Sequence, residues 1–141
     1  KPEKVAPPYW INMGAVAIST LAGATLLISG KEVQFLIQVR PFIMGMTLLF
    51  WSTATWWIPL LLFLYGWRHL LGKVRFSYDA QYWSMVFPLG MYTTCTAQLA
   101  SAANLDFLMP IPHYFIFAAL LAWLLTFMGL IKRIFQFFHV S

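Results

Sequence analysis

Charged side chains are scarce in this sequence of 141 residues, and their scarcity decides its class. Only 9% of the residues are charged, whereas 61% are hydrophobic, and the mean hydropathy is +0.74. A soluble globular domain carries about 25% charged residues, so the composition predicts a membrane protein. The net charge of +5 comes from nine basic and four acidic residues. They are too few and too scattered to predict a nucleic-acid partner.

Cysteine is almost absent as well. The one cysteine, Cys95, excludes an internal disulfide framework and a cysteine-rich metal or iron–sulfur site. A bis-histidine haem needs two imidazoles at similar depth on facing helices. His69 and His113 lie at opposite ends of their apolar segments, and His139 lies beyond the last one. No nucleophile and base lie together at membrane depth. The sequence therefore predicts no enzyme activity, no cofactor and no metal.

Four long runs without Asp, Glu, Lys or Arg make up most of the chain. A helix needs about 20 residues to cross roughly 30 Å of hydrocarbon, and each run has enough apolar length for one crossing. Strands of a membrane barrel would alternate polar and apolar residues over about ten positions. The sequence therefore predicts one all-α polytopic membrane domain over residues 1–141, with transmembrane helices near residues 9–29, 41–65, 82–104 and 113–131.

The charges outside these runs predict a topology. Four crossings place both termini and the middle loop on one side of the membrane. That side then carries seven basic and two acidic residues, and such an excess marks the cytoplasmic side. The residues are Lys1, Lys4, Arg68, Lys73, Arg75, Lys132 and Arg133 against Glu3 and Asp79. The other side holds Lys31 and Arg40 against Glu32 and Asp106. We expect an integral protein of the plasma membrane, in bacteria the inner membrane, with cytoplasmic termini.

The four spans form two similar helical hairpins, over residues 9–67 and 82–133. Tyr9-Trp10 opens the first and Tyr82-Trp83 opens the second, 73 residues later. Each hairpin ends in a bulky span followed by basic residues. Internal repeats are a signature of transporter folds, but a duplicated structural bundle would show the same pattern.

The odd and even spans differ in side-chain size. The first span has Ala15, Ser19 and Gly23 at four-residue spacing. Rows of small residues let helices approach closely. The second and fourth spans carry bulky residues suited to lipid. We expect odd helices inside and even helices outside. On composition alone, a compact bundle is as good an interpretation as a pore.

The third span carries a polar stripe, which favours the pore. Its members follow one another at steps of four and three residues, so they share one helix face. Pro88 is expected to kink the helix and to free the carbonyl of Ser84 beside Phe87. The spans contain no charged residue, so a path here would be neutral, with Phe87 as its plug. The stripe residues are Phe87, Met91, Thr94, Gln98 and Ser101.

Three stretches carry a family resemblance: residues 8–23 (PYWINMGAVAISTLAG), residues 56–61 (WWIPLL) with Trp67-Arg68-His69, and residues 82–93 (YWSMVFPLGMYT). They resemble the tellurite-resistance/dicarboxylate transporter family, which includes yeast malate and sulfite transporters and plant slow anion channels. The resemblance implies five helical hairpins around a pseudo-five-fold pore, with this chain matching helices seven to ten. A phenylalanine on the ninth family helix blocks the pore, and Phe87 is similar to it.

We therefore expect an anion channel or facilitative anion transporter for small inorganic anions or dicarboxylates, gated by Phe87. The alternative is a non-transporting subunit of a larger membrane complex. Two hairpins cannot close a ring of five, and the sequence starts at Lys1 without a Met. In order of preference, we expect a fragment of the ten-helix transporter, an assembly with further copies or a partner chain, or a subunit that has lost transport. The residues expected to line the path are Asn12, Ala15, Ser19, Gly23, Pro88, Gly90, Met91, Thr94, Gln98 and Ser101.

Overall fold

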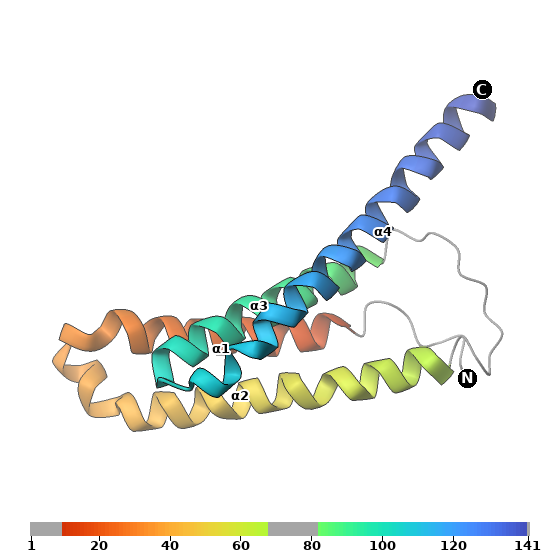
Figure 1. Ribbon diagram of the computed structural model, residues 1–141. Coiled ribbons are helices and arrows are strands. Elements are labelled where there is room, and N and C mark those ends of the chain that lie inside the picture. Colours follow the sequence, from red (N-terminus) through yellow and green to blue (C-terminus); the bar gives the residue numbers. More distant parts are fainter. Residues whose placement is uncertain (1–9, 68–81, 141) are drawn as a thin grey trace.

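The described part of the chain is a set of four long helices (Figure 1). The computed structural model describes residues 10–67 and 82–140. In chain order its elements are α1 (Trp10–Ser29), η3 (Gly30–Glu32), α2 (Gln34–Gly66), α3 (Trp83–Ala103), η6 (Asp106–Leu108) and α4 (Pro110–Val140), where η marks a short 3₁₀ turn. The predicted all-α class is confirmed within these residues.

Part of the topology prediction lies outside the described residues. Five of the basic residues that indicate a cytoplasmic side belong to this part, as do Glu3, Asp79 and His69. The basic residues are Lys1, Lys4, Arg68, Lys73 and Arg75. The orientation of the chain in the membrane therefore stays a prediction.

Three of the described helices are long and apolar enough to cross a membrane, judged by length and composition alone. They cover Trp10–Glu32, Gln34–Leu64 and Asp106–Phe138. The fourth helix, α3, has 21 residues but does not reach the same hydropathy, because Thr, Ser and Gln side chains replace part of its apolar surface. A crossing by α3 therefore stays a prediction, and it requires neighbours that shield these polar groups.

Helix α3 lies between α1 and α4, while α2 packs mainly on α1. One buried cluster joins Met13 and Ala17 of α1 to Tyr92 of α3. A second cluster, further along both helices, joins Leu27 to Leu99. Because the residue numbers rise together, α1 and α3 run side by side in the same direction. Their C-terminal ends therefore lie at the same end of the bundle.

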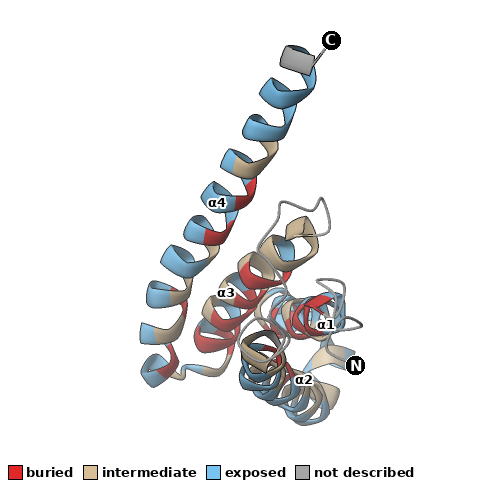
Figure 2. Cartoon of the chain, turned by 90° about the vertical axis from the view of Figure 1, so that its right-hand side faces the viewer, coloured by how far each residue is buried: buried red, intermediate tan, exposed pale blue. Residues whose placement is uncertain are grey.

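The helices differ greatly in how much of their surface is covered. Within its most apolar 18 residues, α1 has 33% of positions buried, whereas α4 has 6%. Figure 2 shows buried residues along α1 and α3, while α4 is exposed over most of its length. In Figure 1 the C-terminal half of α4 extends away from the other three helices. This distribution supports inner positions for α1 and α3 and an outer position for α4.

Helices α2 and α4, which were expected on the outside, both extend beyond the spans expected from hydropathy. Helix α2 begins at Gln34, directly after the extended residue Val33, so Arg40 and Pro41 lie inside it. Helix α4 continues past Lys132 to Val140. At 1.5 Å per residue each helix is roughly 45–50 Å long, which exceeds the hydrocarbon thickness of about 30 Å. On α4, long basic side chains allow such continuation, because they can reach the membrane surface while the backbone stays helical.

A hydrogen-bond network joins α2 to α3 across the two hairpins. Trp51 Nε1 donates to Thr96 Oγ1 at 3.0 Å, and this hydroxyl donates in turn to the carbonyl of Tyr92 at 2.7 Å. The Thr55 hydroxyl lies 2.8 Å from the Tyr92 hydroxyl and donates to the carbonyl of Trp51 at 2.8 Å. Because threonine has a single hydroxyl proton, Tyr92 is the donor to Thr55. The network fixes α3 against α2, although these helices share few other contacts.

Thr96→Val tests this link, since valine keeps the shape of threonine and removes the acceptor for Trp51. Hydrogen bonds between membrane helices average about 0.6 kcal/mol, with a maximum of about 1.7 kcal/mol. We expect a coupling energy in that range from a double-mutant cycle with Trp51→Phe, measured by unfolding in detergent. Thr53→Val is the control, because the exposed Thr53 hydroxyl bonds only to its own helix at Leu49. Additive effects of Thr96→Val and Trp51→Phe would contradict the link.

Candidate functional site

The polar stripe of α3 is the exposed face of that helix. Phe87 is 57% exposed, and Thr94, Gln98 and Ser101 are exposed as well, while Met91 is half-buried. The opposite face of α3 is buried among its neighbours. An unpaired carboxamide is costly against lipid, so Gln98 indicates that this face meets water or protein. The face that the sequence singled out is thus the one that the described helices leave uncovered.

The stripe is neutral and offers only weak ligands to an anion. The Thr94 hydroxyl donates to the carbonyl of Gly90 at 3.1 Å, and the Ser101 hydroxyl donates to that of Ala97 at 3.1 Å. Each hydroxyl must break its hydrogen bond to the helix carbonyl before it can donate to a passing ion. The Gln98 carboxamide has N–H donors and no hydrogen-bond partner in the structure as described. Such a surface would let an anion pass without holding it tightly.

Pro88, next to Phe87 in the chain, packs against α1. Pro88 is buried, and its ring lies against Gly14 of α1. A Cβ atom on Gly14 would lie 3.0 Å from Pro88 Cγ, closer than most such contacts. Glycine at position 14 therefore lets α1 approach α3 at the proline. Successive helical residues point about 100° apart, so Phe87 faces outward where Pro88 faces α1.

The residues of α1 expected to line the path do not all share one environment. Asn12 and Ala15 are exposed, and Ser19 is half-buried, with its hydroxyl donating to the carbonyl of Ala15 at 3.1 Å. Gly23 instead lies against α2, where an added Cβ would collide with Oγ1 of Thr47. The structure thus gives Gly23 a contact with the outer helix of its own hairpin.

A hollow lies beside the stripe, between α3 and α4. It has a volume of about 290 Å³ and is bordered by Gly90 and Thr94 on α3 and by Trp123 on α4. Nothing lies within 4 Å of a Cβ built on Gly90. The expected lining residue Gly90 therefore faces open space, at the side of the stripe that α4 borders.

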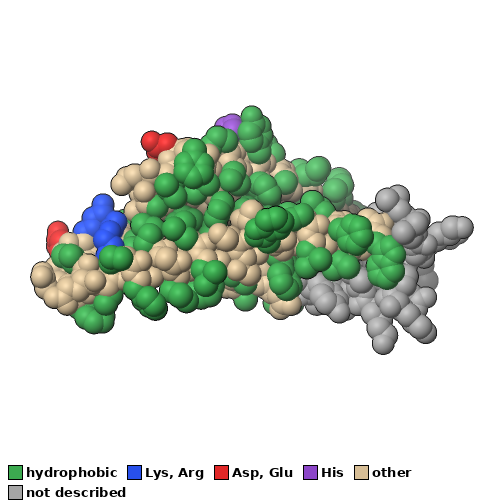
Figure 3. Space-filling view, turned by 90° about the horizontal axis from the view of Figure 1, so that it is seen from below, with side chains coloured by type: hydrophobic (Ala, Val, Ile, Leu, Met, Phe, Trp, Pro, Cys, Tyr) green, Lys and Arg blue, Asp and Glu red, His purple; other side chains and the backbone are tan. Residues whose placement is uncertain are grey.

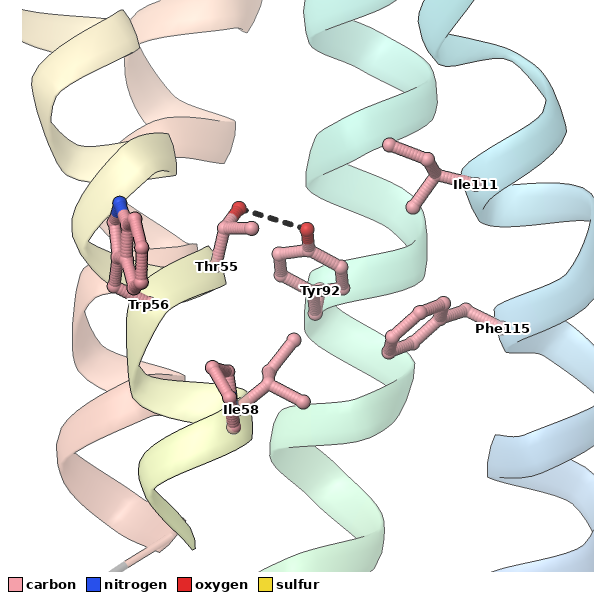
Figure 4. Close-up of a pocket in the computed structure, with 7 residues that line it drawn as sticks. Thr55, Trp56, Ile58, Tyr92, Ile111 and Phe115 are labelled. Carbon is pink, nitrogen blue, oxygen red and sulfur yellow. Dashed lines mark hydrogen bonds between the residues drawn. The ribbon is translucent and has the colours of Figure 1, made fainter. Parts of the chain in front are cut away.

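A second groove lies between α2 and α4 and differs in chemistry (Figure 4). It measures about 370 Å³, and its walls include Trp56, Ile111 and Phe115. Its floor is Tyr92, whose ring centre lies 5.0 Å from that of Phe115 and whose hydroxyl bonds to Thr55. Because the hydroxyl is already paired, the groove is effectively apolar. It suits hydrocarbon better than an anion.

Arg40 is the polar residue that sequence reasoning missed. It was expected in the loop between the first two spans, but its guanidinium lies against the ends of α1 and α3, bonded to the carbonyls of Leu27 and Ala102. Figure 3 shows charged side chains gathered near one end of the described part, with many hydrophobic side chains along the described part of that face. Over the described residues, no group of three His, Cys, Asp or Glu could hold a metal.

These features define an all-helical polytopic membrane protein with an exposed, neutral, hydroxyl-bearing face on an inner helix. Residues 1–131 match the family model described as voltage-dependent anion channel. The chain belongs to this family, which confirms the resemblance found from the three sequence stretches.

Curated relatives also match much of this chain. An uncharacterized membrane protein of Mycobacterium tuberculosis is 34% identical over 134 residues, which are 95% of this chain and 68% of the relative. An uncharacterized transporter of Methanocaldococcus jannaschii is 23% identical over 137 residues, or 96% of this chain and 38% of the transporter. A second transporter of that archaeon is 28% identical over 93 residues, 64% of this chain and 24% of its own length. No solved structure matches the chain.

Proposed function

We propose that the chain forms two hairpins of an anion channel or facilitative anion transporter. The observation that carries the proposal is the neutral, exposed stripe of α3 with Phe87 on it. The family description and the name transporter given to two relatives support movement of a solute across the membrane. Residues of the stripe and the exposed part of α1 would line the path, and the Phe87 ring would close it.

The proposed cargo is a small inorganic anion or a dicarboxylate. Helices α1 and α3 contain no Asp, Glu, Lys or Arg, so no fixed negative charge repels an anion along the stripe. Hydroxyl and carboxamide groups can donate to an anion without binding it strongly. In the proposed assembly the chain supplies helices seven to ten of a ten-helix ring in the plasma membrane, with its termini in the cytoplasm. The remaining helices come from the rest of the transporter, from further copies or from a partner chain.

A non-transporting subunit is the second candidate. The relatives from Mycobacterium tuberculosis are named only as membrane proteins, and the exposed face of α3 could equally be covered by side chains of another protein. In that case the stripe would be dry and packed, and no ion would follow it.

Flux in liposomes decides between the two functions. The complete assembly should be reconstituted and tested for uptake of chloride, nitrate, sulfite and malate, with potassium as the cation control. We expect uptake of at least one anion and none of potassium. Failure of all four anions to enter would overturn the channel and favour the subunit.

A further inference from the structure

Arg40 bonds to the ends of both inner helices at once. It lies in the second turn of α2 and is half-buried. One terminal guanidinium nitrogen, Nη1, donates to the carbonyl of Leu27 at 2.9 Å. The other, Nη2, donates to the carbonyl of Ala102 at 3.4 Å. The planar guanidinium of arginine holds its N–H donors in a rigid fork that reaches two separate acceptors together. The lysine ammonium is a compact point charge and lacks this fork.

Both acceptors belong to helix ends that carry partial negative charge. Leu27 lies in the last turn of α1, which ends at Ser29, and Ala102 lies in the last turn of α3, which ends at Ala103. The last four carbonyls of a helix lack partners within it, and the helix dipole places about half a negative charge there. Two such ends together carry about one negative charge, which one guanidinium offsets.

These ends lie where the polar stripe ends. Helices α1 and α3 run in the same direction, and Ser101, the last residue of the stripe, directly precedes Ala102. An anion that follows the stripe therefore passes both helix ends, and their uncompensated charge would repel it. The other charged residues near this end in the described chain are Lys31, Glu32 and Asp106, which lie in or beside the two 3₁₀ turns.

We infer that Arg40 is a positioning residue that ties the C-terminal ends of α1 and α3 together and cancels their negative charge at one mouth of the anion path. This inference rests on the proposed function. Through its two hydrogen bonds Arg40 sets the spacing of the inner helices at the mouth. Through its charge it allows anions to enter between helix ends that would otherwise favour cations.

The test compares Arg40→Gln with Lys31→Gln in the complete assembly, reconstituted in planar bilayers. Lys31→Gln is the matched control, because it removes one positive charge from the same end of the bundle without touching the two carbonyls. The readout is the reversal potential in a gradient of potassium chloride, which reports selectivity and does not depend on how much protein is active. We expect Arg40→Gln to shift the reversal potential toward cation selectivity and to lower chloride flux about tenfold. About tenfold is the lower end of the increase in association rate that charge at the mouth of a cleft gives. Lys31→Gln should cause a clearly smaller shift.

Arg40→Lys separates the two roles and also serves if Arg40→Gln does not assemble. Lysine keeps the positive charge but not the fork, so selectivity should be retained while the melting temperature in detergent falls. An Arg40→Lys protein that loses anion selectivity and keeps its melting temperature would overturn the inference. So would an Arg40→Gln protein with the reversal potential of Lys31→Gln. A wild type that passes no anion would overturn the proposed function and this inference together, whereas a permeable wild type with a silent Arg40→Gln overturns this inference alone.

Discussion

Replacing Phe87 with alanine should raise the anion conductance of the assembled protein by about ten- to a hundredfold. An ion that squeezes past an apolar ring gives up at least one hydrogen bond to water, and a bond to a charged group contributes about 1.5–3 kcal/mol. Each 1.4 kcal/mol of barrier removed raises a rate about tenfold. Phe87 is 57% exposed on the stripe. Alanine there opens a gap and removes little buried packing. Single-channel recording or anion uptake into liposomes measures the effect.

Phe63→Ala is the matched control for this substitution. Phe63 lies on the outer helix α2 and is 71% exposed. The Thr55–Tyr92 hydrogen bond sets the relative depth of the antiparallel helices α2 and α3, and it places Phe63 toward the same end as Phe87. Phe63→Ala should leave conductance unchanged. Equal conductance of the wild type and Phe87→Ala, in a preparation that passes anions, would show that Phe87 is not the gate.

Gly23→Ala should destabilise the protein by about 1–3 kcal/mol, the usual range for overpacking. The added methyl group would collide with Oγ1 of Thr47. Thr47 is only 1% exposed, and its hydroxyl donates to the carbonyl of Ile43 at 2.7 Å, so the side chain cannot rotate away without losing that bond. The melting temperature in detergent should fall by a few degrees.

Gly45→Ala provides the comparison on the same pair of helices. Nothing lies within 4 Å of a Cβ built on Gly45, and alanine has the higher helix propensity, so this variant should be at least as stable as the wild type. Combining Gly23→Ala with Thr47→Ala removes the colliding atoms and should recover much of the loss. If Gly23→Ala were as stable as Gly45→Ala, the close contact of α1 with α2 would be wrong.

The stripe of α3 could be predicted from sequence because its spacing is unambiguous. Steps of four and three residues average to 3.5, close to the helical repeat of 3.6, so Phe87 and Ser101 stay on nearly the same face over four turns. Polar side chains in an otherwise apolar segment then indicate which face avoids lipid. The structure exposes this same face.

The row of small residues on α1 could not be interpreted in the same way. A step of four residues turns the helix by about 40° beyond a full circle, so Gly23 lies about 80° around the helix from Ala15. That rotation carries Gly23 away from the exposed side and onto α2. A row at strict four-residue spacing therefore drifts steadily to one side of the helix, and only the neighbouring helix shows which member packs.

The position of Arg40 also lay beyond sequence reasoning. A charged residue next to Pro41 is typical of a loop, and hydropathy ends the apolar segment there. The structure instead places Arg40 inside α2, where its partners are carbonyls 13 and 62 residues away in the chain. Contacts of that range depend on how the hairpins pack together, which no local pattern records.

The most direct test of the proposed path is whether water reaches the stripe. Thr94, Gln98 and Ser101 should each be changed to cysteine in a Cys95→Ala background and treated, in membranes, with a charged thiol reagent that does not enter lipid. The control is Leu49→Cys: the Trp51–Thr96 hydrogen bond places Leu49 level with Gln98, and Leu49 is 57% exposed on α2. We predict rapid labelling of the three stripe positions, with loss of anion flux, and no labelling at position 49. Labelling at position 49 without labelling of the stripe, or labelling of neither, would contradict a water-filled path along α3.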